Sequence, residues 1–249
     1  TLSATARDQA NAGNGANGTL IESSLNIPTY LPIFSDQGVP LKWVNFDNIT
    51  YLTNHVNIKS LSLHYIGNVA LNIDFSPHLK FKSSWGVDYN HFKLQQYWGS
   101  NTNIGAAPKI NGYAQVSNTQ SSTFVNEQTL SYTNNLGRHN FGILVGNTLQ
   151  QSGLENVTAS GYNFPNDSYT LISQAASQTA QQSWAQNRLV SFFSRVSYNY
   201  ASKYYLEGTI RGDGSSKFAR GHRWGYFPSI GASWNIRSEE FLQNANTIS

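Results

Sequence analysis

The clearest pattern in the chain is an alternation of apolar and polar side chains between residues 190 and 236. A period of two residues places successive side chains on opposite faces of a β-strand. The alternation predicts a strand that ends near Tyr200, a turn at residues 201–203 and a second strand from Tyr204. It then predicts a surface loop at residues 212–222 and a third strand over residues 224–236. Residues 187–236 are therefore predicted to form antiparallel strands.

Two other stretches show the same alternation and predict strand hairpins over residues 60–98 and 123–152. Their turns fall at residues 76–78 and 134–138, where Pro, Gly and Asn gather. Residues 1–59, 99–122 and 153–186 lack the alternation and are predicted to be mostly long loops. Within the last of these, the Ala, Gln and Ser of residues 173–184 indicate one or two helical turns.

The predicted connections alternate between short turns and long loops, which is typical of up-and-down outer-membrane barrels. In those barrels the short turns are periplasmic and the long loops are extracellular. Strands of about 9–11 residues also suit a tilted crossing of the bilayer. The predicted fold class is all-β: an antiparallel up-and-down transmembrane β-barrel, of which this chain supplies about seven or eight strands.

Aromatic and charged residues fit that interpretation. Aromatic residues near the strand ends predict girdles at the two membrane interfaces: Tyr89, Tyr97, Trp98 and Trp224 by the long loops, and Tyr198, Tyr200, Tyr204 and Trp234 by the short turns. A Lys or Arg that faces lipid at mid-bilayer costs roughly 2–4 kcal/mol. The charged parity is therefore predicted to face the lumen, with Lys80, Lys82, Asp88, Arg195, Glu207 and Arg211 as its members.

A soluble carbohydrate-binding β-sandwich is the main alternative, because one face of each strand would then enter a core and the other would meet water. Only 12% of residues are charged, against about 25% in typical soluble domains. The net charge of +3 is scattered, so no nucleic-acid footprint is expected.

Catalytic chemistry is not indicated. The chain has no Cys, its six His lie far apart without metal-ligand spacing, and it has no Gly-x-Ser-x-Gly elbow. We expect no enzyme activity, no metal and no cofactor. A secreted β-enzyme is a remote third alternative for which the sequence offers no site.

The stretch from Arg188 onward resembles a barrel segment of SusC/RagA-type TonB-dependent transporters. The blocks that carry the resemblance are residues 188–200, 203–206, 211–218 and 223–229, followed by Trp234 and residues 238–241. The order and spacing of these blocks make the similarity specific. Within them, Arg211, Asp213, Gly214, Ser215, Ser216, Lys217 and Phe218 are interpreted as a structural loop. Arg211 and Lys217 are expected to pair with Asp213 or with neighbouring loops.

The resemblance implies an outer-membrane barrel of about 22 strands closed by an N-terminal plug. Residues 1–249 are then expected to be an internal portion of the barrel, without the plug. Such a protein imports glycans or peptides together with a SusD-like surface lipoprotein and draws energy from TonB. The substrate is expected to meet loops 99–122, 153–186 and 212–222, whose aromatic residues can stack on sugars.

Overall fold

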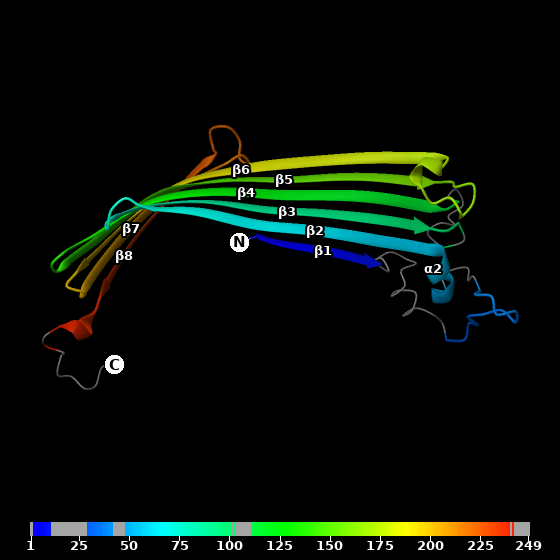
Figure 1. Ribbon diagram of the computed structural model, residues 1–249, viewed down its shortest axis with the longest axis horizontal. Coiled ribbons are helices and arrows are strands. Elements are labelled where there is room, and N and C mark those ends of the chain that lie inside the picture. The colour runs from blue at the N-terminus through cyan, green and yellow to red at the C-terminus, as the bar shows by residue number, and fades with distance from the viewer. Residues whose placement is uncertain are drawn as a thin grey trace.

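The computed structural model describes residues 2–10, 29–41, 48–100, 102, 111–239 and 241. Eight antiparallel strands form one sheet in chain order, as Figure 1 shows. They are β1 (Leu2–Ala10), β2 (Val56–Asp74), β3 (Leu79–Trp98), β4 (Tyr113–Leu136), β5 (His139–Tyr162), β6 (Ser177–Tyr200), β7 (Tyr204–Ser215) and β8 (Trp224–Trp234).

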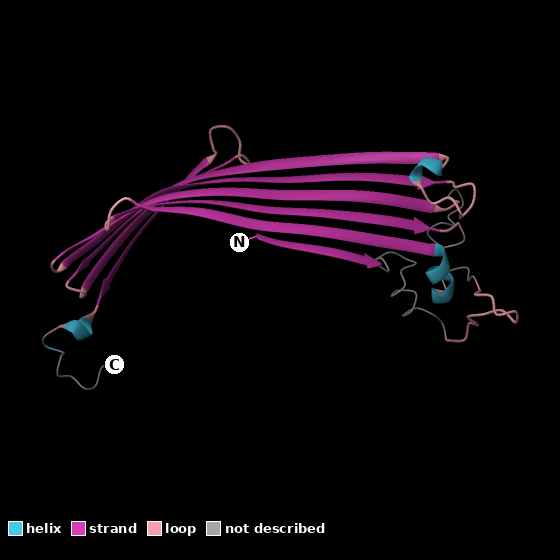
Figure 2. Cartoon of the chain, viewed as in Figure 1, coloured by secondary structure: helices cyan, strands magenta, loops and turns pink. Residues whose placement is uncertain are grey.

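In the described part of the chain the helical elements are few and short. They comprise α2 (Ile49–His55) and the 3-10 turns η1 (Ile172–Gln174) and η2 (Ile236–Ser238), all at the ends of the sheet (Figure 2). Within the described residues, no helix has the length and apolar character needed to cross a membrane. The sandwich alternative needs two sheets packed face to face, whereas the described strands form a single sheet.

Several strands are about twice as long as the alternation predicted. β4, β5 and β6 each contain 24 residues, so residues 113–122, 153–162 and 177–186 are strand and not loop. The helical turns predicted within residues 173–184 reduce to η1, because strand β6 begins at Ser177. Residues 1–59 were predicted to be mostly loop, but they include β1, α2 and the start of β2. The Gly-rich stretch 11–18 lies outside the described residues.

A band of apolar side chains crosses one face of the sheet next to the short turns. On β7 and β8 it runs from the paired residues Tyr204 and Trp234 to the paired residues Gly214 and Trp224. Each strand crosses the band with about ten residues, which at ~3.3 Å per residue and a tilt of ~40° gives a height of roughly 25 Å. That height matches the apolar band of outer-membrane barrels. The predicted strand length was therefore the length of this band, not of the whole strand.

Aromatic rings mark both limits of the band. At the short-turn limit, Tyr204 stacks between Tyr200 and Trp234, with ring centroids 6.4 and 6.2 Å apart. Glu239 accepts hydrogen bonds from the Tyr204 hydroxyl at 2.6 Å and from the Trp234 indole at 3.1 Å. At the other limit, Phe192 stacks on Trp224 at 6.1 Å, and Tyr65 lies beside Tyr89 at 6.3 Å. The band is thus bordered by amphipathic rings on both sides.

Beyond the band, strands β2 to β6 continue as a wall that is largely polar on both faces. Its β6 part reads Ser-Gln-Thr-Ala-Gln-Gln-Ser-Trp-Ala-Gln-Asn-Arg from Ser177 to Arg188. A wall that has water on both sides needs no apolar face, so the period-two signal disappears. The hydrogen-bonded ladder with the neighbouring strand holds this part in the extended conformation.

The buried hydrophobic residues gather at the far end of this wall in two small clusters. Leu52 of α2 packs with Ile58 and Trp98, while Tyr97 packs with Ala114, Phe164 and Ala175. Tyr97 and Trp98 are only 7% and 4% exposed. The prediction that they belong to an aromatic girdle is therefore wrong, because they lie eight and nine positions beyond Tyr89 under the connecting loops.

Asp167 fastens these loops together. Its carboxylate accepts hydrogen bonds from the Ser100 amide at 2.7 Å, the Ser100 hydroxyl at 2.9 Å and the Tyr97 hydroxyl at 3.0 Å. Burial alone would raise the pKa of Asp167, but these hydrogen bonds outweigh it and lower the pKa. Burial and the bond to Asp167 raise the pKa of Tyr97. Residue 112, beside this pair, is a glycine for two reasons. Its φ is +79°, which other residues rarely adopt, and a Cβ there would lie only 3.1 Å from the Tyr97 hydroxyl.

Asp167→Asn tests this contact. We expect the loop at residues 163–176 to lose about 1.5–3 kcal/mol of protection against local opening, the range for hydrogen bonds to a charged group. The folded pKa is lowered, so the stabilisation is present above the unfolded pKa and is lost as the pH falls through the folded pKa. The protection factors of this loop, which are corrected for the intrinsic pH dependence of exchange, should therefore fall as the pH drops below about 4 in the parent and change little in the variant. The exposed Asp36 gives the control Asp36→Asn; an equal effect of both would contradict the assignment.

The band itself is tested by two substitutions at adjacent positions of β6. Val196 lies on the apolar face, and Arg195 lies on the opposite face with its guanidinium 2.6 Å from the Glu207 carboxylate. Val196→Arg should lower the yield of assembled full-length protein, because a charge facing lipid near mid-bilayer costs roughly 2–4 kcal/mol. Arg195→Val should be tolerated better. Heat-modifiable migration on gels measures both yields, and equal yields would refute the lipid-facing assignment.

Candidate functional site

The face opposite the apolar band carries the charged residues. It comprises the even-numbered residues of β2, β3 and β5 and the odd-numbered residues of β4, β6 and β7, because the register pairs these positions directly. All six predicted lumen-facing residues, Lys80, Lys82, Asp88, Arg195, Glu207 and Arg211, lie on this face. We call it the polar face.

Ion pairs on the polar face join neighbouring strands. The Arg195 guanidinium of β6 lies 2.6 Å from the Glu207 carboxylate of β7. The Asp88 carboxylate of β3 accepts a hydrogen bond from the His64 imidazole of β2 at 2.8 Å. Lys80 lies 3.8 Å from Asp74 across the turn between β2 and β3. These side chains are partly exposed, so each pair adds little stability and leaves its charges accessible.

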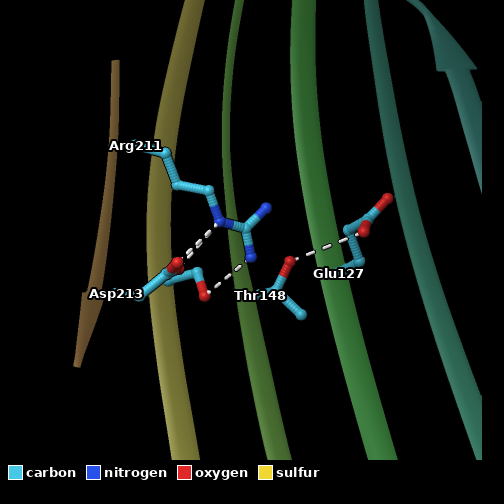
Figure 3. A network of polar contacts seen from close by, with 5 residues as sticks. Glu127, Thr148, Arg211 and Asp213 are labelled. Atoms are coloured by element: carbon cyan, nitrogen blue, oxygen red, sulfur yellow. Dashed lines mark hydrogen bonds and ion pairs between the residues drawn. The ribbon is translucent and has the colours of Figure 1, made fainter. Parts of the chain in front are cut away.

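Arg211 and Asp213 form the centre of the recognised motif. The Arg211 Nε donates to both carboxylate oxygens of Asp213, at 2.8 and 3.0 Å, and its Nη2 donates to the buried Ser191 hydroxyl at 3.1 Å. Figure 3 shows this group beside Thr148, whose hydroxyl donates to Glu127 at 3.5 Å. The predicted pairing of Arg211 with Asp213 is confirmed.

The loop assignment of the motif needs correction. Residues 211–215 are the last residues of strand β7. Arg211 and Asp213 are two positions apart in this strand, so their side chains lie on the same face. Only Ser216, Lys217 and Phe218 lie in the connection to β8, which spans residues 216–223. The Asp-Gly-Ser sequence is typical of turns, but pairing with β6 and β8 keeps it extended here.

Phe193 is an aromatic residue on the polar face. Its ring covers the backbone of Gly146, where an added Cβ would meet the ring at 2.6 Å. The Arg211 guanidinium lies 5.8 Å from the ring centroid, which is a cation–π distance. The alternation in the sequence does not predict this role, because Phe193 has the parity of the polar residues.

In the wall beyond the band, the polar face is uncharged. A set of hydroxyl and amide side chains joins β4 to β5: Asn156 donates to Ser117 at 3.2 Å and to Thr119 at 2.7 Å, and Ser117 contacts Thr158 at 3.1 Å. Gln96 and Gln115 bridge β3 and β4 in the same way. Over β3 to β6 this part of the face carries no Asp, Glu, Lys or Arg.

Sequence reasoning missed these wall residues because it assigned residues 99–122 and 153–186 to loops. The usable signal was weak: Ser, Thr, Asn and Gln recur at every second position, as at Gln115, Ser117 and Thr119. Near the short turns, the polar face also has an open hollow of about 810 Å³, whose lining residues are mostly polar and include the Arg195–Glu207 pair as well as aromatic residues such as Phe141 and Tyr205. Among the described residues, no three His, Asp or Glu gather in a way that could hold a metal ion.

No family model matches the chain. Among curated proteins, it is 32% identical over 203 residues to the TonB-dependent receptor SusC of Bacteroides thetaiotaomicron, covering 78% of this chain and 19% of SusC. It is 28% identical over 246 residues to the TonB-dependent receptor P3 of Formosa agariphila, covering 96% of this chain and 24% of that protein. The chain thus spans about a fifth to a quarter of the length of these relatives.

Among solved structures, the fold is similar to that of the RagAB peptide transporter, with a TM-score of 0.81 and 22% identity. The match covers 98% of this chain and 29% of that one. This likeness extends over the long wall as well as the apolar band. Together with the curated relatives and the motif around Arg211, it assigns the sheet to a known class of outer-membrane β-barrels. The chain belongs to the SusC/RagA family of TonB-dependent receptors.

Proposed function

We propose that this chain forms part of the wall of a TonB-dependent importer that takes up neutral oligosaccharides. The observation that carries the proposal is the uncharged polar face of the wall above the membrane. Ser117, Thr119, Asn156 and Thr158 present hydroxyls and an amide there, which suit the many donors and acceptors of a neutral sugar. An acidic or phosphorylated substrate would find no cation on this part of β3 to β6.

Peptides are the second candidate cargo. The RagAB structure is described as a peptide transporter, and the same amides and hydroxyls can bind a peptide backbone. This part of the wall has no charged residue that could pair with the charged side chains of a peptide. A neutral oligosaccharide is therefore favoured over a peptide as the cargo.

The lower part of the polar face suits a plug. Its charged residues keep much of their surface exposed, and the hollow beside Arg195 and Glu207 is open and lined by small side chains such as Ser197 and Ser229. A folded plug of complementary charge fits this surface. A SusD-like lipoprotein would then cover the outer end of the wall. There, α2 and the loop at residues 163–176 each pack against the ends of the strands through buried hydrophobic residues.

Uptake by cells that express the full-length protein and its lipoprotein partner tests the class of function. Cells should accumulate labelled neutral oligosaccharide, and loss of TonB should abolish accumulation, because the plug needs external work to open. Accumulation of labelled peptide without oligosaccharide would move the proposal to the peptide cargo. TonB-independent accumulation of both would contradict import by this protein.

Asn156→Asp tests the wall directly in the full-length protein. The change keeps the size of the side chain but adds a charge and removes the donor to Ser117 and Thr119. Oligosaccharide affinity should fall about fivefold, since one hydrogen bond contributes about 1 kcal/mol. The matched control is Gln186→Glu, which lies on the opposite face of β6 and is exposed. Calorimetric titration measures both, and equal losses would refute the role of the wall.

A further inference from the structure

The apolar band contains a groove at its outer limit. It has a volume of about 390 Å³, and its walls include Phe192 and Ser194 of β6, Ile210 of β7, and Trp224 and Tyr226 of β8. Its floor is the backbone of Gly212, where an added Cβ would lie 3.2 Å from the Tyr226 ring. The neighbouring Gly214 is covered by Trp224 in the same way, at 2.9 Å. Two glycines in β7 therefore create a recess between aromatic side chains.

A group of cations lies beside the groove. The connection at residues 216–223 carries Lys217, Arg220 and Arg223, all exposed, and has no acidic residue. Arg188 lies on the same face of β6 as Phe192, and its backbone accepts a hydrogen bond from the Ser216 amide at 2.9 Å. No carboxylate among the described residues forms an ion pair with any of these four cations. The nearby Asp213 is on the opposite face and is bound to Arg211.

The position of the 216–223 connection along the strands decides whether it lies near lipid or near the substrate. β7 and β8 end where Leu189 of β6 pairs with Ser215, whereas β6 continues outward to Ser177. Figure 1 shows the connection between β7 and β8 about midway along the length of β6, far from the outer end of the wall. The residues of β8 from Trp224 to Trp234 already account for the roughly 25 Å of apolar band. The connection therefore lies at the level of the lipid headgroups and not, as predicted, where substrate first arrives.

We propose that the groove and its cations form a binding site for an anionic, phosphate-bearing lipid of the outer leaflet. An acyl chain would lie between Phe192, Trp224 and Tyr226, and the phosphate would lie among Lys217, Arg220 and Arg223. The assignment combines charge complementarity with continuity, because the groove opens directly onto the band that faces lipid. It gives the Ser-Ser-Lys-Phe part of the motif a role that is separate from import.

Native mass spectrometry of the full-length protein in mild detergent tests the site, with phosphatidylglycerol and phosphatidylcholine as probes. The parent should retain phosphatidylglycerol in preference to phosphatidylcholine. Combined Lys217→Gln, Arg220→Gln and Arg223→Gln substitutions should remove that preference, with a loss of about fivefold for each cation near the surface. Ser194→Leu, which fills the groove with an apolar side chain, should reduce retention of both lipids.

The matched control is the combination Lys80→Gln, Lys82→Gln and Arg195→Gln, which removes the same charge from the polar face and should keep the preference. No preference in the parent, or an equal loss in the control, would overturn the proposal. So would displacement of phosphatidylglycerol by inorganic phosphate alone, because the acyl chain would then contribute nothing. Heat-modifiable migration of each variant shows that it is assembled, and lipid retention is read without any transport, so failure here is distinct from failure of import.

Discussion

The pairing of backbone amides and carbonyls between neighbouring strands is the constraint on which the rest of this structure depends. A strand that crosses the hydrocarbon has no water to satisfy its backbone, so each strand must lie beside another. Strands β2 to β6 keep a continuous antiparallel register through the apolar band and on into the wall above it. The ladder thus carries extended structure from a region where side chains favour it into one where they do not.

That continuity gives one sheet three different surfaces. The apolar face of the band meets lipid, the polar face beside it holds charges at half-exposed positions, and the wall above presents neutral hydroxyls and amides. In the proposed importer, the change from charged to neutral side chains along the polar face corresponds to a change of task. Charged groups such as Arg195 and Glu207 suit contact with a folded plug, and neutral groups such as Asn156 and Thr158 suit a ligand that must bind and then leave.

The recognised motif has a similar division of tasks along a few residues. Arg211 and Asp213 face inward and tie β7 to Ser191 of β6, while Gly212 and Gly214 face outward and make room for aromatic rings. Lys217 follows in the connection at the membrane surface. A single short segment therefore has residues on the polar face, on the apolar face and, in the proposed lipid site, at the headgroup level in turn, which accounts for the sharp alternation of its residue types.

The sequence by itself determined the fold class, the strand directions, the short turns, the set of charges that shares one face of the sheet, and the family. These depend on local signals: period-two alternation, turn residues and the ordered blocks after Arg188. Only the tertiary structure decided the length of the strands, the burial of Tyr97 and Trp98, the strand conformation of residues 211–215 and the neutral wall. Each of these follows from pairing with a neighbouring strand or packing under a distant loop. Such contacts join residues like Tyr97 and Asp167, 70 positions apart, and leave no periodic trace in the sequence near either one.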